Sequence, residues 1–249
     1  ISDKAHTTRE PQDINIEYNQ EKLTLIDTAG INKKYRQSRD KLKQKSIQRS
    51  LSSLKKSNIA ILMFDISKGI TKQDKKIVEE AIEANKSIII VANKWDLIEE
   101  KDSKYYTQYI RNKLPFAHWA PIVFTKCKTK IKAFQEINFN QEEVKQETVS
   151  KKIRKIMDLI IQINQERSLE LTDKQLERLM KKFVKIHLPA KDKGTKKPHI
   201  YEIFQSNTNP PEFKVRIGKK DSLHFSYIRF IKNQIREKFG FIGTPINIK

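Results

Sequence analysis

Three continuous apolar runs alternate with helical patterns in the middle of this 249-residue chain. The runs cover residues 59–64, 87–92 and 121–124, and amphipathic patterns at 71–84 and 103–113 lie between them. Strands that are apolar on both faces are typical of parallel sheets covered by helices on both sides. The alternation therefore predicts an α/β fold with a mostly parallel, doubly wound sheet.

The segments on either side of these runs define a first domain. Two short β-like runs between residues 13 and 26 are separated by a polar turn and predict a hairpin. Residues 128–147 are rich in lysine, glutamine and asparagine, so we expect an inserted, mobile loop there. A helical pattern at 148–164 completes the unit. We predict a first domain over residues 1–166.

A change of composition marks a second unit of about 80 residues, near the lower end of ordinary domain size. Its apolar pattern predicts a helix from residue 172, strands at 200–204 and 213–217, a helix at 222–239 and a last strand at 246–248. The order α-β-β-α-β indicates a small α+β domain. We predict that it covers residues 167–249.

The charge of the chain indicates a polyanionic partner. The sequence has 51 Lys and Arg against 30 Asp and Glu, a formal net charge of +21, and nucleic acid is the partner that such a field favours. Coding bias toward lysine is the alternative explanation. The single cysteine, Cys127, excludes an internal disulfide and favours a reducing compartment. The apolar runs are shorter than the roughly 20 residues of a membrane span, so we expect no membrane partner.

Two motifs at strand ends predict a nucleotide site. In Asp27-Thr28-Ala29-Gly30, the aspartate can hold a magnesium ion through water, and the glycine lets a backbone N–H approach the terminal phosphate. A plain strand-end turn is the alternative reading of this stretch. In Asn93-Lys94-Trp95-Asp96, the Asp96 carboxylate can accept hydrogen bonds from guanine N1 and N2, which adenine cannot offer. Asn93 would brace this loop and the Lys94 stem would cover the base.

The phosphate-binding loop that usually accompanies these motifs does not occur in the sequence. No G-x-x-x-x-G-K-[ST] stretch is found in the 249 residues. We therefore expect the chain to be a fragment that cannot hydrolyse GTP alone, because neither motif can hold the β-phosphate. No catalytic residue is assigned.

Several longer stretches resemble one family, the Der (EngA) ribosome-assembly GTPases. The most specific lie near the end of the chain: Asn209-Pro-Pro-Glu-Phe213, Leu223-His-Phe-Ser-Tyr-Ile-Arg229 and Gly240-Phe-Ile-Gly-Thr-Pro-Ile246. His6-Thr7-Thr8-Arg9-Glu10 is similar to the first switch of that family, with His6 in place of glycine. The resemblance implies a second GTP-binding domain of the P-loop NTPase type, here truncated at its N-terminus, followed by a KH-like RNA-binding domain.

The resemblance also implies ligands and site residues. Thr8, with Thr7 as the alternative, would contact Mg²⁺ together with Asp27, and Gly30 would contact the phosphate. The Cys127 backbone would contact guanine, although Lys126-Cys127 replaces the Ser-Ala of the family. Ile31 stands where other GTPases have a glutamine that orients water, and such proteins rely on K⁺ or a ribosomal partner. GTP, Mg²⁺ and K⁺ are the implied cofactors.

Basic residues of the second domain are the candidates for RNA contact. We assign no Gly-x-x-Gly clamp of the kind found in true KH domains, so we expect recognition of structured ribosomal RNA by shape and charge. We expect the aromatic side chains of this domain to form its core. The candidates for phosphate contact are Lys214, Arg216, Lys219, Lys220, Arg229, Lys232 and Arg236.

The sequence thus predicts a monomeric GTP-binding protein that acts in large-subunit assembly by binding ribosomal RNA. The cytoplasm or an organellar matrix is the expected compartment. The alternative is a non-catalytic RNA-binding or scaffold protein with a degenerate nucleotide site, which the missing loop, His6 and Lys126-Cys127 favour. The intact Asp27 and Asp96 oppose this alternative, because an empty fold does not need them.

Overall fold

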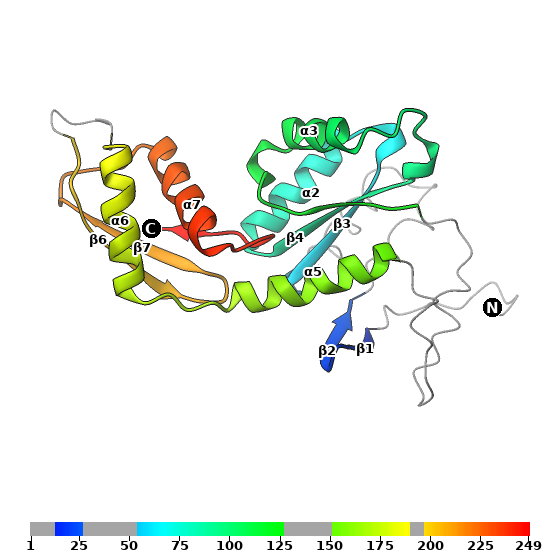
Figure 1. Cartoon of the computed structure of the whole chain (residues 1–249), viewed down its shortest axis with the longest axis horizontal. Helices are drawn as coiled ribbons and strands as arrows, with labels where there is room; N and C mark the ends of the chain where they lie inside the picture. Colours follow the sequence, from blue (N-terminus) through cyan, green and yellow to red (C-terminus); the bar gives the residue numbers. More distant parts are fainter. Residues whose placement is uncertain (1–12, 27–53, 127–150, 190–196) are drawn as a thin grey trace, which may run out of the picture.

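The computed structural model of the chain describes residues 13–26, 54–126, 151–189 and 197–249. Within these ranges, a parallel sheet with its helices forms one part of the molecule, and a smaller α+β unit follows it (Figure 1). The predicted insertion at 128–147 lies outside the described residues. The fold class predicted from the sequence is confirmed.

The three apolar runs form the parallel sheet. Strands β3 (Ile59–Asp65), β4 (Ser87–Asn93) and β5 (Ile122–Phe124) pair in that order, with β4 in the centre. The crossovers carry helices α2 (Lys72–Glu83) and α3 (Ser103–Lys113). All three strands therefore end at the same edge of the sheet, which brings the loops after them together.

The central strand β4 is buried on both faces, as its apolar run predicts. Ile88 and Ile90 contribute to the core on the side of α2 and α3, and Ile89 and Val91 to a second core on the other side. Helix α5 (Lys151–Arg167) covers that second face (Figure 1). All four side chains are fully buried, so the sheet is wound on both sides.

Local signals fix where the helices begin and end. Thr71 is the N-cap of α2 and forms a capping box with Asp74. Asp102 caps α3 by accepting the first free backbone N–H groups of that helix. Short 3-10 helices follow β3, β4 and α3 at Ile66–Lys68, Trp95–Leu97 and Pro115–Ala117.

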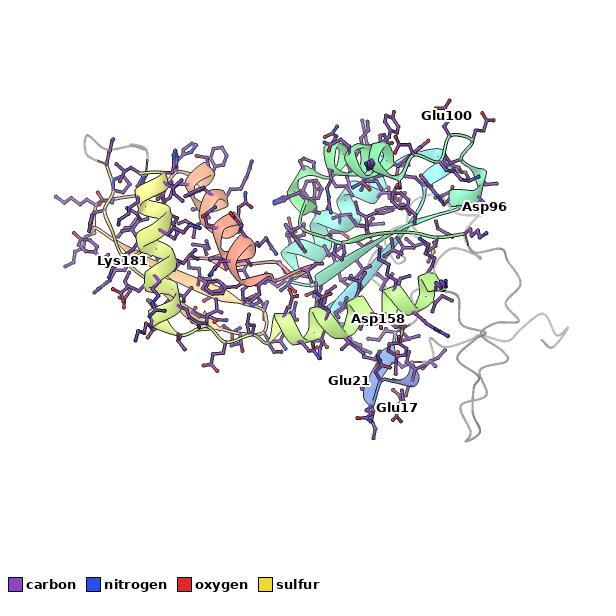
Figure 2. All side chains as sticks on the ribbon, in the orientation of Figure 1. Glu17, Glu21, Asp96, Glu100, Asp158 and Lys181 are labelled. Carbon is purple, nitrogen blue, oxygen red and sulfur yellow. The ribbon has the colours of Figure 1, made fainter. Side chains whose placement is uncertain are left out.

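The predicted hairpin is present near the start of the described residues. Strands β1 (Ile14–Tyr18) and β2 (Glu21–Leu25) pair antiparallel around a two-residue turn at positive φ. The Tyr18 hydroxyl donates to Asp158 Oδ1 at 2.8 Å, which places the hairpin against α5 (Figures 1 and 2). The same hydrogen bond is the main reason that the pKa of Tyr18 is raised.

The C-terminal unit has the order α-β-β-α-β that the sequence predicts. Helices α6 (Asp173–Ile186) and α7 (Phe225–Phe239) pack against a sheet of β6 (Ile200–Asn207), β7 (Glu212–Ile217) and β8 (Asn247–Ile248). Strand β7 lies in the centre, antiparallel to β6 and parallel to β8. This arrangement leaves the other face of the sheet, with its charged side chains, open to solvent.

Most aromatic residues of this unit form its core or pack against it, whereas Tyr201 and Phe225 are exposed. Phe213, Tyr227 and Phe241 are at most 2% exposed, and Phe183 is fully buried with them. Phe225 is 64% exposed, so the prediction that it packs in the core is wrong. It is the first residue of α7.

A turn after α7 joins the C-terminal unit to the parallel sheet. The backbone N–H of Ile88 donates to Gly243 O at 2.6 Å, and the N–H of Gly243 donates to Trp119 O at 3.3 Å. Gly243 has φ +61°, and a Cβ there would lie 2.6 Å from Ile163 Cδ1. The glycine of the Gly240-Phe-Ile-Gly-Thr-Pro-Ile246 motif is therefore required by this close approach.

A buried arginine at the end of α5 crosses the same junction. Arg167 is 3% exposed and donates to Ser87 Oγ and to the Asn85 carbonyl, both at 2.9 Å. Its Nε donates to Asn209 Oδ1 of the C-terminal unit. Burial lowers the pKa of this guanidinium group. Arg167 thus connects the amino end of β4 to the loop between β6 and β7.

Candidate functional site

The predicted guanine-reading loop lies at the carboxyl end of β4. Asn93 is the last residue of the strand and pairs in register with Asp65, the last residue of β3. Lys94 follows in the left-handed region with φ +61°, and a 3-10 turn then carries Asp96. The positive φ of Lys94 turns the chain sharply away from the direction of β4. It directs the loop outward from the sheet edge.

Contacts with the next strand brace this loop. The Thr125 hydroxyl donates to Asn93 Oδ1 at 3.0 Å, and the Trp95 N–H donates to Thr125 O at 3.0 Å. The Trp95 ring packs on Phe124 and Tyr106, with centroids 4.4 and 5.1 Å away. Thr125 follows β5 directly and is buried. The loop is therefore held by contacts with the end of β5 and with Tyr106 of α3.

An ion pair fixes Lys94. Its Nζ lies 2.5 Å from Asp65 Oδ2, while the Ser67 hydroxyl donates to Asp65 Oδ1 at 2.6 Å. These hydrogen bonds, that of Lys94 first, lower the pKa of Asp65. Sequence reasoning assigned no role to Asp65. The sequence contains a signal for such a role. Parallel strands end at one edge of a sheet, β3 ends in Asp65, and the neighbouring strand β4 ends just before Lys94.

The Asp96 carboxylate is open to solvent. Figure 2 shows Asp96 at the rim of the molecule, beyond the end of the sheet and on the same side as Glu100. Across the part of the chain that the structure describes, no hydrogen bond or ion pair occupies its carboxylate oxygens. An unoccupied acceptor beside braced neighbours can receive the two donors that guanine presents on one edge.

The residues predicted for the phosphate and metal end lie outside the described part of the chain. These are Thr8, Asp27 and Gly30, together with Cys127 of the base-lining loop. Their roles stay predictions. Among the described residues, no group of three or more His, Cys, Asp and Glu side chains is placed to hold a metal ion.

The predicted RNA-contacting residues are spread over the sheet and α7 of the C-terminal unit. Lys214 and Arg216 lie on the solvent face of β7, where Arg216 Nε is 3.1 Å from Glu202 Oε2. Lys219 and Lys220 are exposed in the turn that follows β7. Arg229 is exposed on α7. The turn and the start of α7 therefore carry cations without an ion pair among the described residues.

Two of the predicted residues are less accessible. Burial, and then the nearby charge of Arg236, lowers the pKa of Lys232. Arg236 is turned inward: its guanidinium donates to the Phe241 and Thr244 carbonyls at 2.5 Å and lies 4.8 Å from the Trp119 ring. This corrects the prediction for Arg236, because its donors are used inside the junction and cannot face a phosphate.

No helix among the described residues is long and apolar enough to cross a membrane. The helices that the structure describes are amphipathic, with polar side chains on one side.

Two family models match this chain. A model described as "50S ribosome-binding GTPase" matches residues 1–94, and a model described as "KH-domain-like of EngA bacterial GTPase enzymes, C-terminal" matches residues 171–249. The first match ends at Lys94, within the braced loop. The second covers the whole of the α-β-β-α-β unit.

Relatives of similar sequence carry the name GTPase Der. That of Caldanaerobacter subterraneus subsp. tengcongensis is 34% identical over 250 residues, which is 100% of this chain and 52% of the relative. That of Natranaerobius thermophilus is 36% identical over 251 residues, again 100% of this chain and 52% of the relative. The chain thus spans about half the length of the curated relatives it matches.

Solved structures give a weaker likeness. A crystal structure of Era in complex with MgGDPNP and nucleotides of 16S ribosomal RNA matches with a TM-score of 0.40 and 20% identity, covering 100% of this chain and 82% of that chain. This likeness is too low to carry an argument about function.

Proposed function

Because the chain belongs to the Der (EngA) family of GTPases, we propose that it forms part of a GTP-binding protein of large-ribosomal-subunit assembly. The proposed activity is GTP-dependent binding to ribosomal RNA, with GTP hydrolysis carried out by the whole protein. The proposed ligands are GTP and Mg²⁺, with K⁺ as a further cofactor. The proposed division of the chain is a GTP-binding domain at 1–166 and an RNA-binding domain at 167–249.

The observation that carries the nucleotide proposal is the open Asp96 carboxylate beside a braced Asn93 and an anchored Lys94. Guanine presents N1–H and an N2 amino group on one edge, and a carboxylate can accept from both. Adenine presents no such pair. Hydrogen bonds to a charged group contribute about 1.5–3 kcal/mol each, so two of them favour guanine by roughly 100-fold or more.

Asp65 would position Lys94 for the same task. With its ammonium group held by Asp65, the methylene stem of Lys94 has a fixed direction and can lie along one face of the base. Ser67 in turn orients the Asp65 carboxylate. The pair links the last residue of β3 to the residue that follows β4.

The RNA-binding half of the proposal rests on charge. Residues 171–249 contain 18 Lys and Arg against 7 Asp and Glu, so about a third of the chain carries a net charge of +11 of the total +21. The exposed cations Lys219, Lys220 and Arg229 can contact phosphates without first breaking an ion pair among the described residues. Such contacts release counterions and give a salt-dependent affinity.

Two measurements on the full-length natural protein test the proposal. Calorimetric titration should give binding of GDP and GTP with at least about 100-fold preference over ADP and ATP, from the two hydrogen bonds to Asp96. Equal binding of both bases would refute the guanine assignment. Affinity for ribosomal RNA should fall steeply between low and moderate salt. RNA binding without any nucleotide binding would support the non-catalytic alternative instead.

A further inference from the structure

The start of α7 carries an exposed aromatic ring with an imidazole and a guanidinium group beside it. Phe225 is 64% exposed, its ring centroid lies 4.2 Å from that of His224, and Arg229 Cζ lies 5.7 Å from the ring centroid. A large apolar ring exposed to this extent is not explained by packing within the unit, whose core contains Phe213, Tyr227 and Phe241.

The side chains around Phe225 are held in place. His224 is the N-cap of α7, and its Nδ1 accepts from the Ser226 N–H and lies 2.7 Å from Ser226 Oγ. The imidazole is therefore fixed beside the Phe225 ring by the same contacts that begin the helix. Arg229 lies one helical turn further on, where an i, i+4 pair faces the same side. The Phe225 ring, the fixed imidazole and the guanidinium group of Arg229 thus form one aromatic and cationic surface.

The charge around this surface suits phosphates. Between Lys214 and Lys238 there are eight Lys and Arg but only two acidic residues, Asp221 and Glu237. Lys219 and Lys220 lie in the turn that leads into α7, six and five residues before Phe225. Six residues span at most about 22 Å, so both lysines lie within reach of an RNA backbone that passes Phe225.

We propose that the surface formed by His224, Phe225 and Arg229, with Lys219 and Lys220 beside it, binds an unpaired nucleotide of RNA. The base stacks on the Phe225 ring, with Arg229 at its edge, and the two lysines contact the flanking phosphates. Base stacking on aromatic side chains accepts any base, and the contacts need no Gly-x-x-Gly clamp. The proposal rests on the RNA-binding function proposed above, and it adds single-stranded segments to the recognition by shape and charge that the sequence predicts.

The position of the surface leaves it accessible. The junction with the parallel sheet is made at the other end of α7, by Arg236 and the turn that contains Gly243. A 15-residue helix is about 22 Å long, so Phe225 lies far from that junction (Figure 1). RNA at this surface would not have to displace contacts between the two parts of the chain.

Charge favours RNA over a protein partner at this surface. A protein partner for Phe225 would need an apolar patch surrounded by acidic groups, whereas single-stranded RNA supplies a stacking face and phosphates in every nucleotide. A protein partner is therefore one outcome of the test that would overturn the proposal.

The test compares short single-stranded RNA and a duplex of the same length by fluorescence anisotropy, using the full-length protein. Stacking of one base corresponds to about a 5- to 150-fold change in affinity, so Phe225→Ala and Phe225→Leu should weaken single-strand binding by that range and duplex binding by less than about twofold. Phe225→Trp should keep or raise the affinity for single-stranded RNA. Tyr105→Ala is the matched control, since Tyr105 is an aromatic residue 62% exposed on α3.

The outcomes separate this proposal from the general one. If the wild type binds RNA with a steep salt dependence but both Phe225 variants bind single strands normally, the stacking site is refuted and the RNA-binding function stands. An equal loss for single strands and duplex, or a Phe225 variant that changes association with a protein and not with RNA, also overturns it. If the wild type binds neither RNA, both proposals fail. Lys219→Ala with Lys220→Ala should weaken both RNAs and reduce the salt dependence.

Discussion

Replacing Arg167 with methionine should loosen the junction between the sheet and the C-terminal unit. Methionine keeps most of the length of the buried side chain and removes its donors. The Asn85 carbonyl and the Ser87 hydroxyl then lose their partner, while Asn209 is exposed and can bind water. Ser87 keeps its contact with Thr244 at 3.1 Å, which limits the loss.

The expected loss of free energy in Arg167→Met follows from these groups. An unsatisfied buried acceptor costs about 1–3 kcal/mol, and one carbonyl plus part of one hydroxyl are affected. Arg167 also has no carboxylate partner among the described residues, so its removal recovers some desolvation energy. We expect a net loss of about 2 kcal/mol, which corresponds to a roughly 30-fold easier opening of the junction.

Native-state hydrogen exchange measures this opening directly. The amides of Ile88, Ile242 and Gly243 cross the junction, so their exchange should be accelerated by that factor. The amide of Ile90, which donates to Pro121 O at 2.9 Å within the sheet, should exchange as before. Lys155→Met, an exposed position on the same helix, is the control. Unchanged exchange at all three junction amides, with an intact fold, would refute the role given to Arg167.

Two further predictions concern the junction and the guanine loop. Gly243→Ala should destabilise the protein by about 1–3 kcal/mol in urea unfolding, because φ is positive and the new methyl would meet Ile163 Cδ1 and Ile88 O. Gly218→Ala should have a smaller effect, because the new methyl would meet only the side chain of Asp221, which can rotate away. Equal losses of stability would contradict this account. Asp65→Asn should weaken guanine nucleotide binding by about two- to fivefold, the size expected of a part-exposed ion pair. Lys94 lowers the pKa of Asp65, so this ion pair stabilises the folded protein above the ordinary aspartate pKa of about 4. The stabilisation is lost as the pH falls through the lowered pKa, so the difference in stability between wild type and Asp65→Asn should vanish in acid. A difference that persists in acid would contradict the ion-pair explanation.

Local patterns were sufficient to predict most of the described elements. The apolar runs at 59–64 and 87–92 correspond to β3 and β4, and Thr71 caps α2 as its side chain suggests. These features depend on residues that are close in sequence, on periodicity and on capping chemistry. The prediction for Asn93 and Asp96 has the same local basis, since their motif is contiguous.

Features that depend on tertiary contacts were not predicted. Arg236 reads as one more surface cation, but the turn at Gly240–Thr244 folds back over it and uses its donors on backbone carbonyls. Phe225 reads as a core residue, yet it is exposed at the first position of α7. Asp65 acquires its role only when β3 and β4 lie side by side. The partner of Asp65 is 29 residues away, and the carbonyls that Arg236 binds lie in a turn outside its own helix.

The most direct test of the central claim is a change of base specificity through Asp96. Xanthine carries a carbonyl acceptor where guanine carries the N2 amino donor, so an asparagine at this position can donate to it. In the full-length protein, Asp96→Asn should weaken GDP binding by about 100-fold or more and give measurable binding of xanthosine diphosphate, with stability unchanged because Asp96 has no partner among the described residues. If Asp96→Asn binds GDP as well as the wild type does and gains no affinity for xanthosine diphosphate, Asp96 does not read the base.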